Sequence, residues 1–568
     1  MDRITKSLLD AFASETDLLH LPEDKQFEHF ASYLTANRFL AESFDTGEIV
    51  TTQPDGGIDG IALVVNGALV TDADLVAEFE TTNGYLDATF IFVQADRSAS
   101  FDSAKIGQFG FGVSDFFSTS PQLPRGARTA SAAAVMTALY DRSRTFRRGN
   151  PVCRLYYVTT GRVTPDAVLE ARRSGVVADL RQLGIFRDVD FTLVGADEIQ
   201  RLYNQTRNAI TREFTFDKKT VMPEMPGVTE AYIGLVPAQD FVVLLDDGNG
   251  GIQRSLFYDN VRDFQDYNPV NSEMKATLES ESGRLRFALM NNGVTIVARS
   301  LRTTGNRVCI EDFQVVNGCQ TSHVLFDHRE HLDPGVYLPL RLIATQDDAV
   351  LASIAKATNR QTEVKAEQLI ALSDFQKKLE AYCLTFPPAQ QLLYERRSRQ
   401  YDRVARVEKT RIITPSSLIR AYASIFLEEP HRTTRDYKRL LERIGTSIFG
   451  PDDRLEPYYY AASAVYRLEF LFRNARIAAR FKPARYQILL AARLLQAPDK
   501  PPRANSHEMV RYCETLIGPI WDAGPAEQLF ARATEVVDST AAGNFDRDRI
   551  RTQPFTEELK RNCLLPPA

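Results

Sequence analysis

The stretch GGIDGIALVVNG (residues 56–67) is followed along the chain by a second apolar stretch, ATFIFVQADRS (residues 88–98). The apolar part of the first stretch predicts a strand, and Asn66-Gly67 predicts the hairpin turn that ends it. The second stretch begins with a nearly continuous apolar run, which is typical of a strand buried on both faces. A polar residue stands at one end of each strand: Asp59 opens the first, and the triplet Gln94-Ala95-Asp96 closes the second.

The segments around these two strands predict an α/β domain that ends near residue 200. Residues 24–38 place apolar side chains at helical spacing, and an extended segment follows near 47–52. Further along, helical patterns alternate with buried strands. The helices are expected at 100–118, 131–145 and 165–184, and the strands at 153–161 and 189–195.

The rest of the chain divides into a linker, an α/β core and a helical region. After the 1–200 domain, the polar residues 201–227 are expected to be the linker, and residues 228–365 the α/β core. Strands of that core are expected within 241–252, 286–298, 308–318 and 338–345. Residues 366–568 have a mostly helical pattern with breaks at 428–431, 449–453 and 497–503. The expected fold class is therefore a multidomain α/β and α+β protein with a mostly α-helical C-terminal region.

The net charge of −6 conceals an uneven distribution along the chain. Residues 1–100 hold 18 Asp and Glu against 5 Lys and Arg, and this balance of −13 leaves +7 for the remaining residues. Two basic runs stand out in that remainder, 394–411 and 467–485. Basic residues interleaved with Tyr and Phe suit a nucleic-acid backbone with stacked bases, and they equally suit a solvated helix face. Because the whole chain is acidic, any contact with nucleic acid is expected to be local.

The composition is that of a soluble globular protein, with 25% charged and 44% apolar residues. No stretch approaches the roughly 18 uninterrupted apolar residues of a membrane helix. The first residues carry acids where a signal peptide needs an apolar segment. Six cysteines stand far apart without a CxxC pair, which favours free thiols in a reducing cytoplasm. A cytoplasmic protein without membrane contact is expected.

The polar residues at the strand ends predict a metal site. Asp59 offers a carboxylate oxygen and Gln94 an amide oxygen, so the expected cofactor is Mg²⁺ or Mn²⁺. A lysine at position 96 would orient water and stabilise developing charge, but Asp96 stands there and becomes a candidate third metal ligand. Lys105, in the next predicted helix, is the candidate for the role of that lysine. Glu28, on the first of these helices, is a candidate further acid near the metal.

The order of elements over about residues 25–165 resembles the PD-(D/E)xK restriction-endonuclease-like fold, with Asp59 in the expected strand. Gln94 stands where that fold usually has Glu or Asp, and Asp96 stands where it has Lys. Some members carry the lysine on a neighbouring helix, as Lys105 would. The resemblance implies metal-dependent phosphodiester hydrolysis. In the alternative interpretation, Asp59 caps a turn and Lys105 is an exposed helix residue.

Three polar segments, at 290–298, 314–326 and 357–364, place Asn with Gln or Thr beside an apolar strand or at a helix start. Their carboxamides can bind a base edge or phosphate oxygens, or they can lock neighbouring loops together. The helix start beside Gln320 and Thr321 also offers backbone N–H groups to an anion. The proximity of the three segments in the sequence favours one shared site.

These segments, together with FYDNVRDFQ (257–265) and YERRSRQY (394–401), resemble the AIPR family, the bacterial abortive-infection phage-resistance proteins. The resemblance covers about residues 228–435 and implies anti-phage defence, with the restriction-like N-terminal domain as the effector. It also implies a substrate or nucleotide site in the middle domain. By position, this site is expected to be lined by Arg262, Asn291, Asn292, Asn317, Gln320, Thr321, Asn359, Gln361, Glu395 and Arg396.

Two functions of different classes are consistent with these patterns. The first is a metal-dependent nuclease of a defence system, with DNA as its partner. The second is a binding protein, in which the nuclease fold has lost catalysis and only holds nucleic acid, or in which the middle domain senses a nucleotide or a phage component. RNA, a homo-oligomer and defence-system partner proteins stay open as partners.

Overall fold

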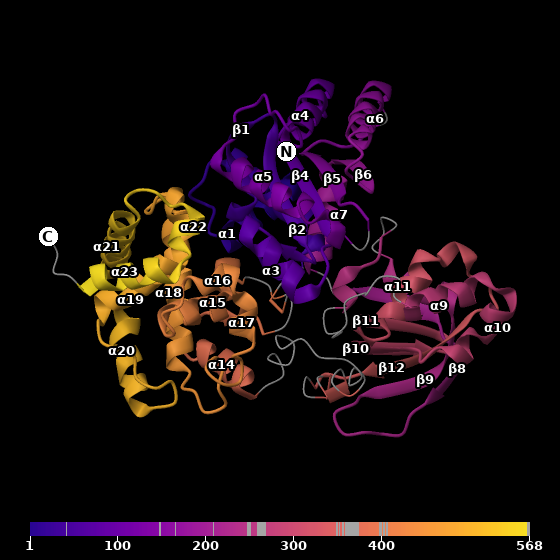
Figure 1. Cartoon of the computed structure of the whole chain (residues 1–568). Helices are drawn as coiled ribbons and strands as arrows, with labels where there is room; N and C mark the ends of the chain where they lie inside the picture. The colour runs from indigo at the N-terminus through magenta and orange to yellow at the C-terminus, as the bar shows by residue number, and fades with distance from the viewer. Residues whose placement is uncertain are drawn as a thin grey trace. The chain divides into compact units, whose positions relative to one another are not determined.

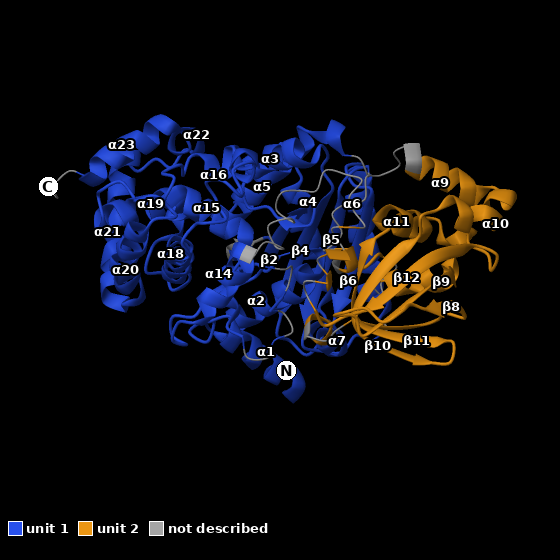
Figure 2. Cartoon of the chain, turned by 90° about the horizontal axis from the view of Figure 1, so that it is seen from below, with its two compact units in different colours: residues 1–203, 373–568 blue, residues 204–372 orange. Residues whose placement is uncertain are grey.

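The structure, a computed structural model, divides into two compact units (Figures 1 and 2). Unit 1 comprises Met1–Tyr203 and Ser373–Ala568, so it joins the N-terminal part of the chain to the C-terminal helices. Unit 2 comprises Asn204–Leu372. The residues that the structure describes are 1–40, 42–146, 149–164, 166–207, 210–246, 251–257, 269–347, 350–351, 353–354, 357, 374–396, 400–401, 404 and 407–564.

The N-terminal part of unit 1 is built on a mixed sheet with the strand order β1-β2-β4-β5-β6. Its strands are β1 (Val50–Asp55), β2 (Ile58–Val65), β3 (Ala68–Leu69), β4 (Ala88–Asp96), β5 (Val152–Thr159) and β6 (Asp188–Val194). β1, β2 and β4 are antiparallel neighbours, whereas β4, β5 and β6 run parallel. Asn66 and Gly67 both have positive φ and join β2 to β3, which confirms the expected hairpin turn.

Helices cover both faces of this sheet (Figure 1). One face carries α1 (Arg3–Glu15), α2 (Glu23–Ala36) and α7 (Ala196–Arg207), and the other carries α3 (Ala73–Asn83), α4 (Ser103–Phe116), α5 (Ala127–Tyr140) and α6 (Ala167–Gln182). Ile91 of β4 packs with the first group, and its neighbour Phe90 packs with the second. Because successive side chains of a strand point to opposite faces, a strand covered on both sides needs apolar residues throughout. This explains the continuous apolar run in β4.

The elements expected in this part of the chain are confirmed within a few residues. The helices expected at 24–38, 100–118, 131–145 and 165–184 are α2, α4, α5 and α6, and the strands expected at 153–161 and 189–195 are β5 and β6. The sheet places the ends of β2 and β4 that carry Asp59 and Gln94 side by side, because the last pair in their ladder is Gly60 with Val93.

The C-terminal part of unit 1 is mostly helical. Its helices are α14 (Asp374–Leu384), α15 (Pro415–Ile425), α16 (Arg432–Arg435), α17 (Tyr437–Leu441), α18 (Glu456–Arg473), α19 (Arg485–Gln496), α20 (His507–Trp521), α21 (Ala523–Ala541), α22 (Arg547–Ile550) and α23 (Gln553–Leu564). Two short strands, β13 (Leu393–Tyr394) and β14 (Ile412–Ile413), pair in parallel. The three expected breaks, at 428–431, 449–453 and 497–503, all fall between helices, as predicted.

Ion pairs join the acidic N-terminal part of unit 1 to its basic C-terminal part. Asp72 and Asp74, at the start of α3, pair with Arg551, whose side chain is only 5% exposed. Elsewhere, Glu48 pairs with Arg485 at 3.0 Å, and Asp45 pairs with Arg473 at 3.3 Å. The uneven charge of the sequence is therefore used inside the protein. Basic residues of the run 467–485 are engaged by these acids, so that run is not simply a solvated surface.

Unit 2 contains a six-stranded sheet with the order β7-β11-β10-β12-β9-β8. Its strands are β7 (Thr211–Thr215), β8 (Lys218–Val221), β9 (Glu230–Pro237), β10 (Val294–Thr304), β11 (Arg307–Asn317) and β12 (Tyr337–Ala344). Its main helices are α8 (Ala238–Leu245), α9 (Pro269–Glu279), α10 (Glu281–Met290) and α11 (Cys319–Asp327). One face of the sheet packs against α8, α9, α10 and α11 in a single large core. The whole chain thus combines mixed α/β sheets with a helical region, which confirms the expected fold class.

Two expectations for the middle of the chain differ from the structure. Residues 201–227, expected to be a linker, contain the end of α7 and the strands β7 and β8, which form both edges of the unit 2 sheet. Edge strands expose one side to solvent, so their sequence is polar enough to resemble a linker. The strand expected within 241–252 is instead α8, because the apolar run is too short for its period to be recognised.

All six cysteines are free in the structure, and five of them are buried. Among the described residues, no helix combines the length and the apolar character that crossing a membrane requires.

Candidate metal site and asparagine cluster

Asp59 and Gln94 lie together at the end of the β2–β4 ladder. The Asp59 carboxylate accepts a hydrogen bond through Oδ2 from the backbone N–H of Ala95, at 2.8 Å. Gln94 is only 6% exposed, and its Oε1 atom is buried without a hydrogen-bond partner among the described residues. A buried carbonyl oxygen without a donor costs about 1–3 kcal/mol. This position therefore holds an oxygen that a donor or a cation would satisfy.

The Asp96 carboxylate forms an ion pair with Lys105. Lys105 reaches back from the first turn of α4, and its Nζ atom lies 2.7 Å from Oδ2 of Asp96. Ser98 adds two hydrogen bonds to the same carboxylate, from its backbone N–H at 3.0 Å and from its hydroxyl at 2.9 Å. Burial alone would raise the pKa of Asp96, but the bonds from Lys105 and Ser98 hold it below its usual value. Lys105 of α4 thus places its ammonium group at the end of β4.

Burial raises the pKa of Asp59 to about 7. The charge of Glu28 acts in the same direction, whereas the Ala95 N–H and the charges of Lys25 and Lys105 oppose it. Glu28 itself has a raised pKa, again because of burial, although Lys25 Nζ lies 2.8 Å from its Oε1. Asp59 is therefore a carboxylate whose ionisation near neutral pH depends on nearby positive charge.

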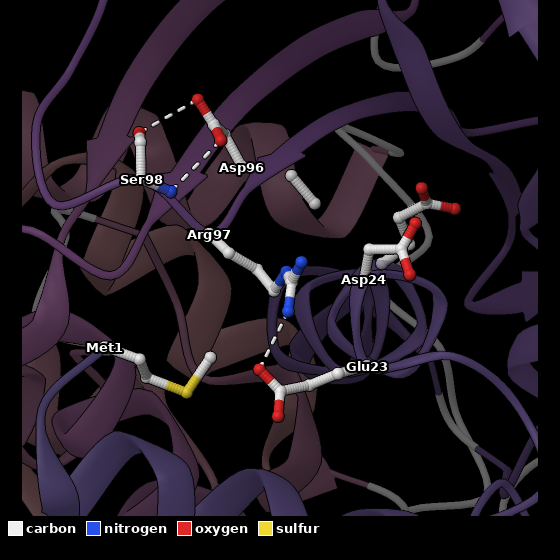
Figure 3. A pocket seen from close by; sticks show the side chains of 8 residues that line it. Met1, Glu23, Asp24, Asp96, Arg97 and Ser98 are labelled. Atoms are coloured by element: carbon white, nitrogen blue, oxygen red, sulfur yellow. Dashed lines mark hydrogen bonds and ion pairs between the residues drawn. The ribbon is translucent and has the colours of Figure 1, made fainter.

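A cavity of about 520 Å³ opens at the end of β4, and Asp59, Gln94 and Lys105 are not among its lining residues (Figure 3). α2 contributes Glu23, Asp24 and Glu28 to its wall, and the end of β4 and the following residues contribute 95–98. Arg97 lies between Asp96 and Glu23 in Figure 3, and its Nη1 contacts Glu23 Oε1 at 2.8 Å. Two of the three α2 acids in this wall are paired with cations, Glu23 with Lys6 and Arg97 and Glu28 with Lys25.

Whether this site can bind a metal ion depends on how many side-chain oxygens can reach the same ion. Within the described residues, no group of three or more His, Cys, Asp and Glu side chains is placed to hold a metal ion. A cation here would therefore have at most two acidic side chains as ligands, with the amide oxygen of Gln94 and water as further ligands. The sequence predicted that Asp59, Gln94, Asp96 and Lys105 lie near one another. It did not predict the contacts of Arg97 and Ser98. The acidic start of α2, Glu23-Asp24, was the available signal for the cavity wall.

In unit 2, Asn291, Gln320 and Thr321 form hydrogen bonds near the start of α11. We call these three residues the asparagine cluster. Asn291 accepts from the N–H of Gly293 at 2.8 Å and donates to the Thr321 hydroxyl at 3.1 Å. Gln320 accepts a hydrogen bond from Asn271 of α9 at 2.6 Å. Gly318, just before α11, has φ +94°, and a Cβ there would lie 3.0 Å from the Gly293 carbonyl oxygen. These contacts lock neighbouring loops together, one of the two roles expected for the carboxamides.

The other members of the expected middle site are distributed over the chain. Asn317 ends β11 opposite Thr295, and Asn292 is exposed before β10. Glu395 and Arg396 belong to unit 1: Glu395 accepts from the Ser43 hydroxyl at 2.9 Å, and Arg396 Nε lies 2.9 Å from Glu380 Oε2. Three more lie outside the described residues, namely Arg262, Asn359 and Gln361. A single site formed by all ten residues stays a prediction.

Comparison with known proteins gives one match. Residues 257–479 match the model of the family described as AIPR protein, which supports the family resemblance of the sequence motifs. The matched residues run from unit 2 into the C-terminal helices of unit 1 and do not include the sheet that carries Asp59 and Gln94. No curated protein and no solved structure matches the chain.

Proposed function

We propose, from the AIPR match of residues 257–479, that the chain acts in abortive-infection defence against phage, as a metal-dependent nuclease whose catalytic site is in unit 1. DNA is the proposed substrate, and the AIPR-matched region is proposed to bind nucleic acid or a nucleotide. The observation that carries the nuclease proposal is the position of Lys105. Its ammonium group lies at the end of β4, beside the strand ends that carry Asp59 and Gln94.

The donors of the site fit a magnesium ion. Mg²⁺ usually keeps several waters and takes only one or two protein carboxylates, so Asp59 and the unsatisfied Oε1 of Gln94 meet its needs without a third acid. When bound, the metal would supply Lewis-acid activation of the phosphodiester. Asp59 would hold the ion, and Lys105 would orient a water and stabilise negative charge on the phosphate. Asp96 and Ser98 would position the Lys105 ammonium group.

A specific observation favours the alternative function. Asp96 already neutralises Lys105, and a lysine held in an ion pair stabilises a transition state less than an unpaired one. Under this alternative, the nuclease-like fold of unit 1 has lost catalysis and serves as a nucleic-acid or nucleotide-sensing module in a defence complex.

Replacing Lys105 with alanine is expected to lower plasmid cleavage by about 10²-fold or more, because it removes the ammonium group at the end of β4. The assay incubates supercoiled plasmid with the full chain in Mg²⁺ or Mn²⁺ and follows nicked and linear DNA. Lys105→Arg should keep part of the activity, since it keeps the positive charge. Lys378→Ala, on the exposed face of α14, is the matched control. An inactive wild type with both metals would favour the alternative, and unchanged cleavage by Lys105→Ala would reject the role of Lys105.

Cleavage is also expected to depend on pH through Asp59. Its pKa is raised to about 7, so the proton competes with the metal below pH 7 and leaves the site free above it. At a subsaturating Mg²⁺ concentration, the rate should fall about tenfold per pH unit below 7 and level off above it. Saturating Mg²⁺ should move this transition to lower pH. A rate that is constant between pH 6 and 8 at low Mg²⁺ would contradict metal binding by Asp59.

A further inference from the structure

A second cavity in unit 1, of about 300 Å³, shares no lining residue with the cavity at the end of β4. Its wall comes from two parts of the chain that are distant in sequence. Residues 16–71 of the N-terminal part form one side, and residues 409–489, which include β14, α18 and the start of α19, form the other. Cavities of this size are at the lower end of the range that small organic ligands occupy.

Arg473 lines this cavity with an incompletely satisfied guanidinium group. The side chain is 10% exposed, and its Nη1 atom pairs with Asp45 Oδ2 at 3.3 Å. Its Nε and Nη2 atoms are buried and have no hydrogen-bond partner among the described residues. These two nitrogens lie on one edge of the guanidinium plane, and that edge donates two parallel hydrogen bonds to a phosphate or a carboxylate. Neighbouring atoms cover both nitrogens, so a ligand reaches them only after the Arg473 side chain moves.

The charges around the cavity favour an anion. Glu48 and Glu469 also line it, but each is already paired with Arg485, at 3.0 Å and 3.2 Å. Lys482 and Arg128 approach Glu48 as well, at 3.3 Å and 3.8 Å. Although burial would raise the pKa of Glu48, these cations hold it far below its usual value. Glu48 is therefore ionised, and both carboxylates are paired.

The lining of the cavity itself is balanced in charge: Asp45, Glu48 and Glu469 stand against Lys409, Arg473 and Arg485. Arg128 and Lys482, which are not part of the lining, approach Glu48 and add two further positive charges. Burial lowers the pKa of the nearby His29 to about 4, so this histidine is neutral and adds no charge. An anionic group entering the cavity would thus meet a net positive surrounding.

Aromatic rings and hydroxyl groups form the rest of the wall. Tyr33 and Phe44 stack with ring centroids 5.8 Å apart, and Tyr466 and Tyr486 also line the cavity. Lys409 donates a hydrogen bond to the Tyr33 hydroxyl at 2.6 Å. Rings that stack a planar base, hydroxyls that bond a sugar and a guanidinium edge that binds a phosphate are together the requirements of a nucleotide.

We propose that this cavity binds a mononucleotide, with its phosphate on the Nε–Nη2 edge of Arg473 and its base among the aromatic side chains. The bound nucleotide contacts both the N-terminal part and the helical part of unit 1. This site is separate from the proposed metal site and from the asparagine cluster of unit 2. It accounts for the otherwise unsatisfied donors of Arg473.

The test is isothermal titration of the full chain with AMP, and separately with adenosine and with inorganic phosphate. AMP is expected to bind, and adenosine or phosphate alone to bind at least about tenfold more weakly, because each lacks half of the contacts. Arg473→Lys keeps the charge beside Asp45 but loses the two-nitrogen edge, and it should weaken AMP binding by about tenfold or more. Arg480→Lys makes the same change outside the cavity, on a side chain that is 59% exposed, and should leave binding unchanged.

Val465→Phe is a second variant that leaves every charge in place. Val465 lines the cavity, so the larger ring should occupy space needed by the base and weaken AMP binding while the protein stays folded. Three results would overturn the proposal: no binding of AMP, phosphate binding as tight as AMP, or AMP binding that survives both Arg473→Lys and Val465→Phe. Binding lost only in Gln320→Ala would place the nucleotide in unit 2 and would also overturn it. None of these outcomes depends on DNA cleavage.

Discussion

Asp59→Asn is expected to abolish metal-dependent cleavage while it stabilises the metal-free protein above pH 7. The asparagine keeps an oxygen for the Ala95 N–H but cannot bind a divalent cation as a carboxylate does, so cleavage should fall by at least about 10²-fold. Its stability effect follows from the pKa. Burial raises the pKa of Asp59 from 3.8 to about 7 in the folded chain, so folding holds the proton more tightly than the unfolded chain does.

The sign of the stability effect can be derived from this shift. Below pH 3.8 the carboxyl group is neutral in both states and contributes nothing. Between that value and pH 7 the unfolded chain ionises first, so the folded chain loses stability as the pH rises, by up to about 4 kcal/mol. Asparagine removes this ionisation. In EDTA, the variant should therefore match wild type at pH 4 and exceed its thermal midpoint at pH 8.

The matched control is Asp179→Asn, which makes the same change on the exposed face of α6. It should change neither cleavage nor the pH dependence of the thermal midpoint. Loss of cleavage together with a lower midpoint at pH 8 would mean that Asp59 supports the fold and not a metal. A loss of activity together with a gain in stability cannot be explained by unfolding. The two measurements therefore distinguish a metal-binding role of Asp59 from a structural role.

The sheet of unit 1 was predictable because its strands are buried on both faces and its helices carry wide apolar stripes. α3 was not predicted; only Val76 and Glu78 are buried along it, although α6, which was predicted, also has only two buried residues, Val176 and Leu180. The apolar run of α8 predicts a strand, although its burial pattern is helical: Phe241 and Leu245 are buried, while Val243 is 59% exposed. A run of five apolar residues fits either period, and only the tertiary packing decides between them.

The sequence predicted which residues form the candidate metal site, but it did not predict their contacts. Lys105 follows Asp96 by nine residues, at the start of the helix after β4, which is close enough for the two to meet. The sequence contains no signal that Gln94 Oε1 lacks a donor or that burial shifts the pKa of Asp59. The missing donor and the shifted pKa both depend on how α2 and α4 cover the end of β2 that carries Asp59 and the end of β4 that carries Gln94. The Arg473 cavity was unpredictable for a similar reason, since its two sides come from segments more than 300 residues apart.

The uneven charge of the sequence leads to the second large effect, the loss of stability expected for Arg551→Met. Arg551 pairs with both carboxylates at the start of α3: its Nη1 lies 2.9 Å from Asp72 Oδ1 and 2.5 Å from Asp74 Oδ2, and its Nη2 contacts Asp72 Oδ2. Its removal leaves two carboxylates in a largely buried position. Breaking a buried pair from one side costs about 3–5 kcal/mol. Arg547 and Arg435, which also contact these acids, should limit the loss to about 3 kcal/mol.

Urea unfolding followed by the fluorescence of Trp521 measures this effect, because the chain's single tryptophan lies in the helical part of unit 1. Arg547→Met is the matched control: it contacts the same Asp72 at 3.3 Å from a 28% exposed position and should cost less than about 1 kcal/mol. Burial would raise the pKa of Asp72, but Arg551, Arg547 and the backbone N–H of Asp74 hold it below its usual value, so this contribution is present above pH 4 and is lost as the pH falls through the lowered pKa. The difference between wild type and Arg551→Met should therefore shrink in acid. Equal losses for the two variants, or a difference that persists unchanged at low pH, would show that the acidic start of α3 and the C-terminal helices do not stabilise each other through charge.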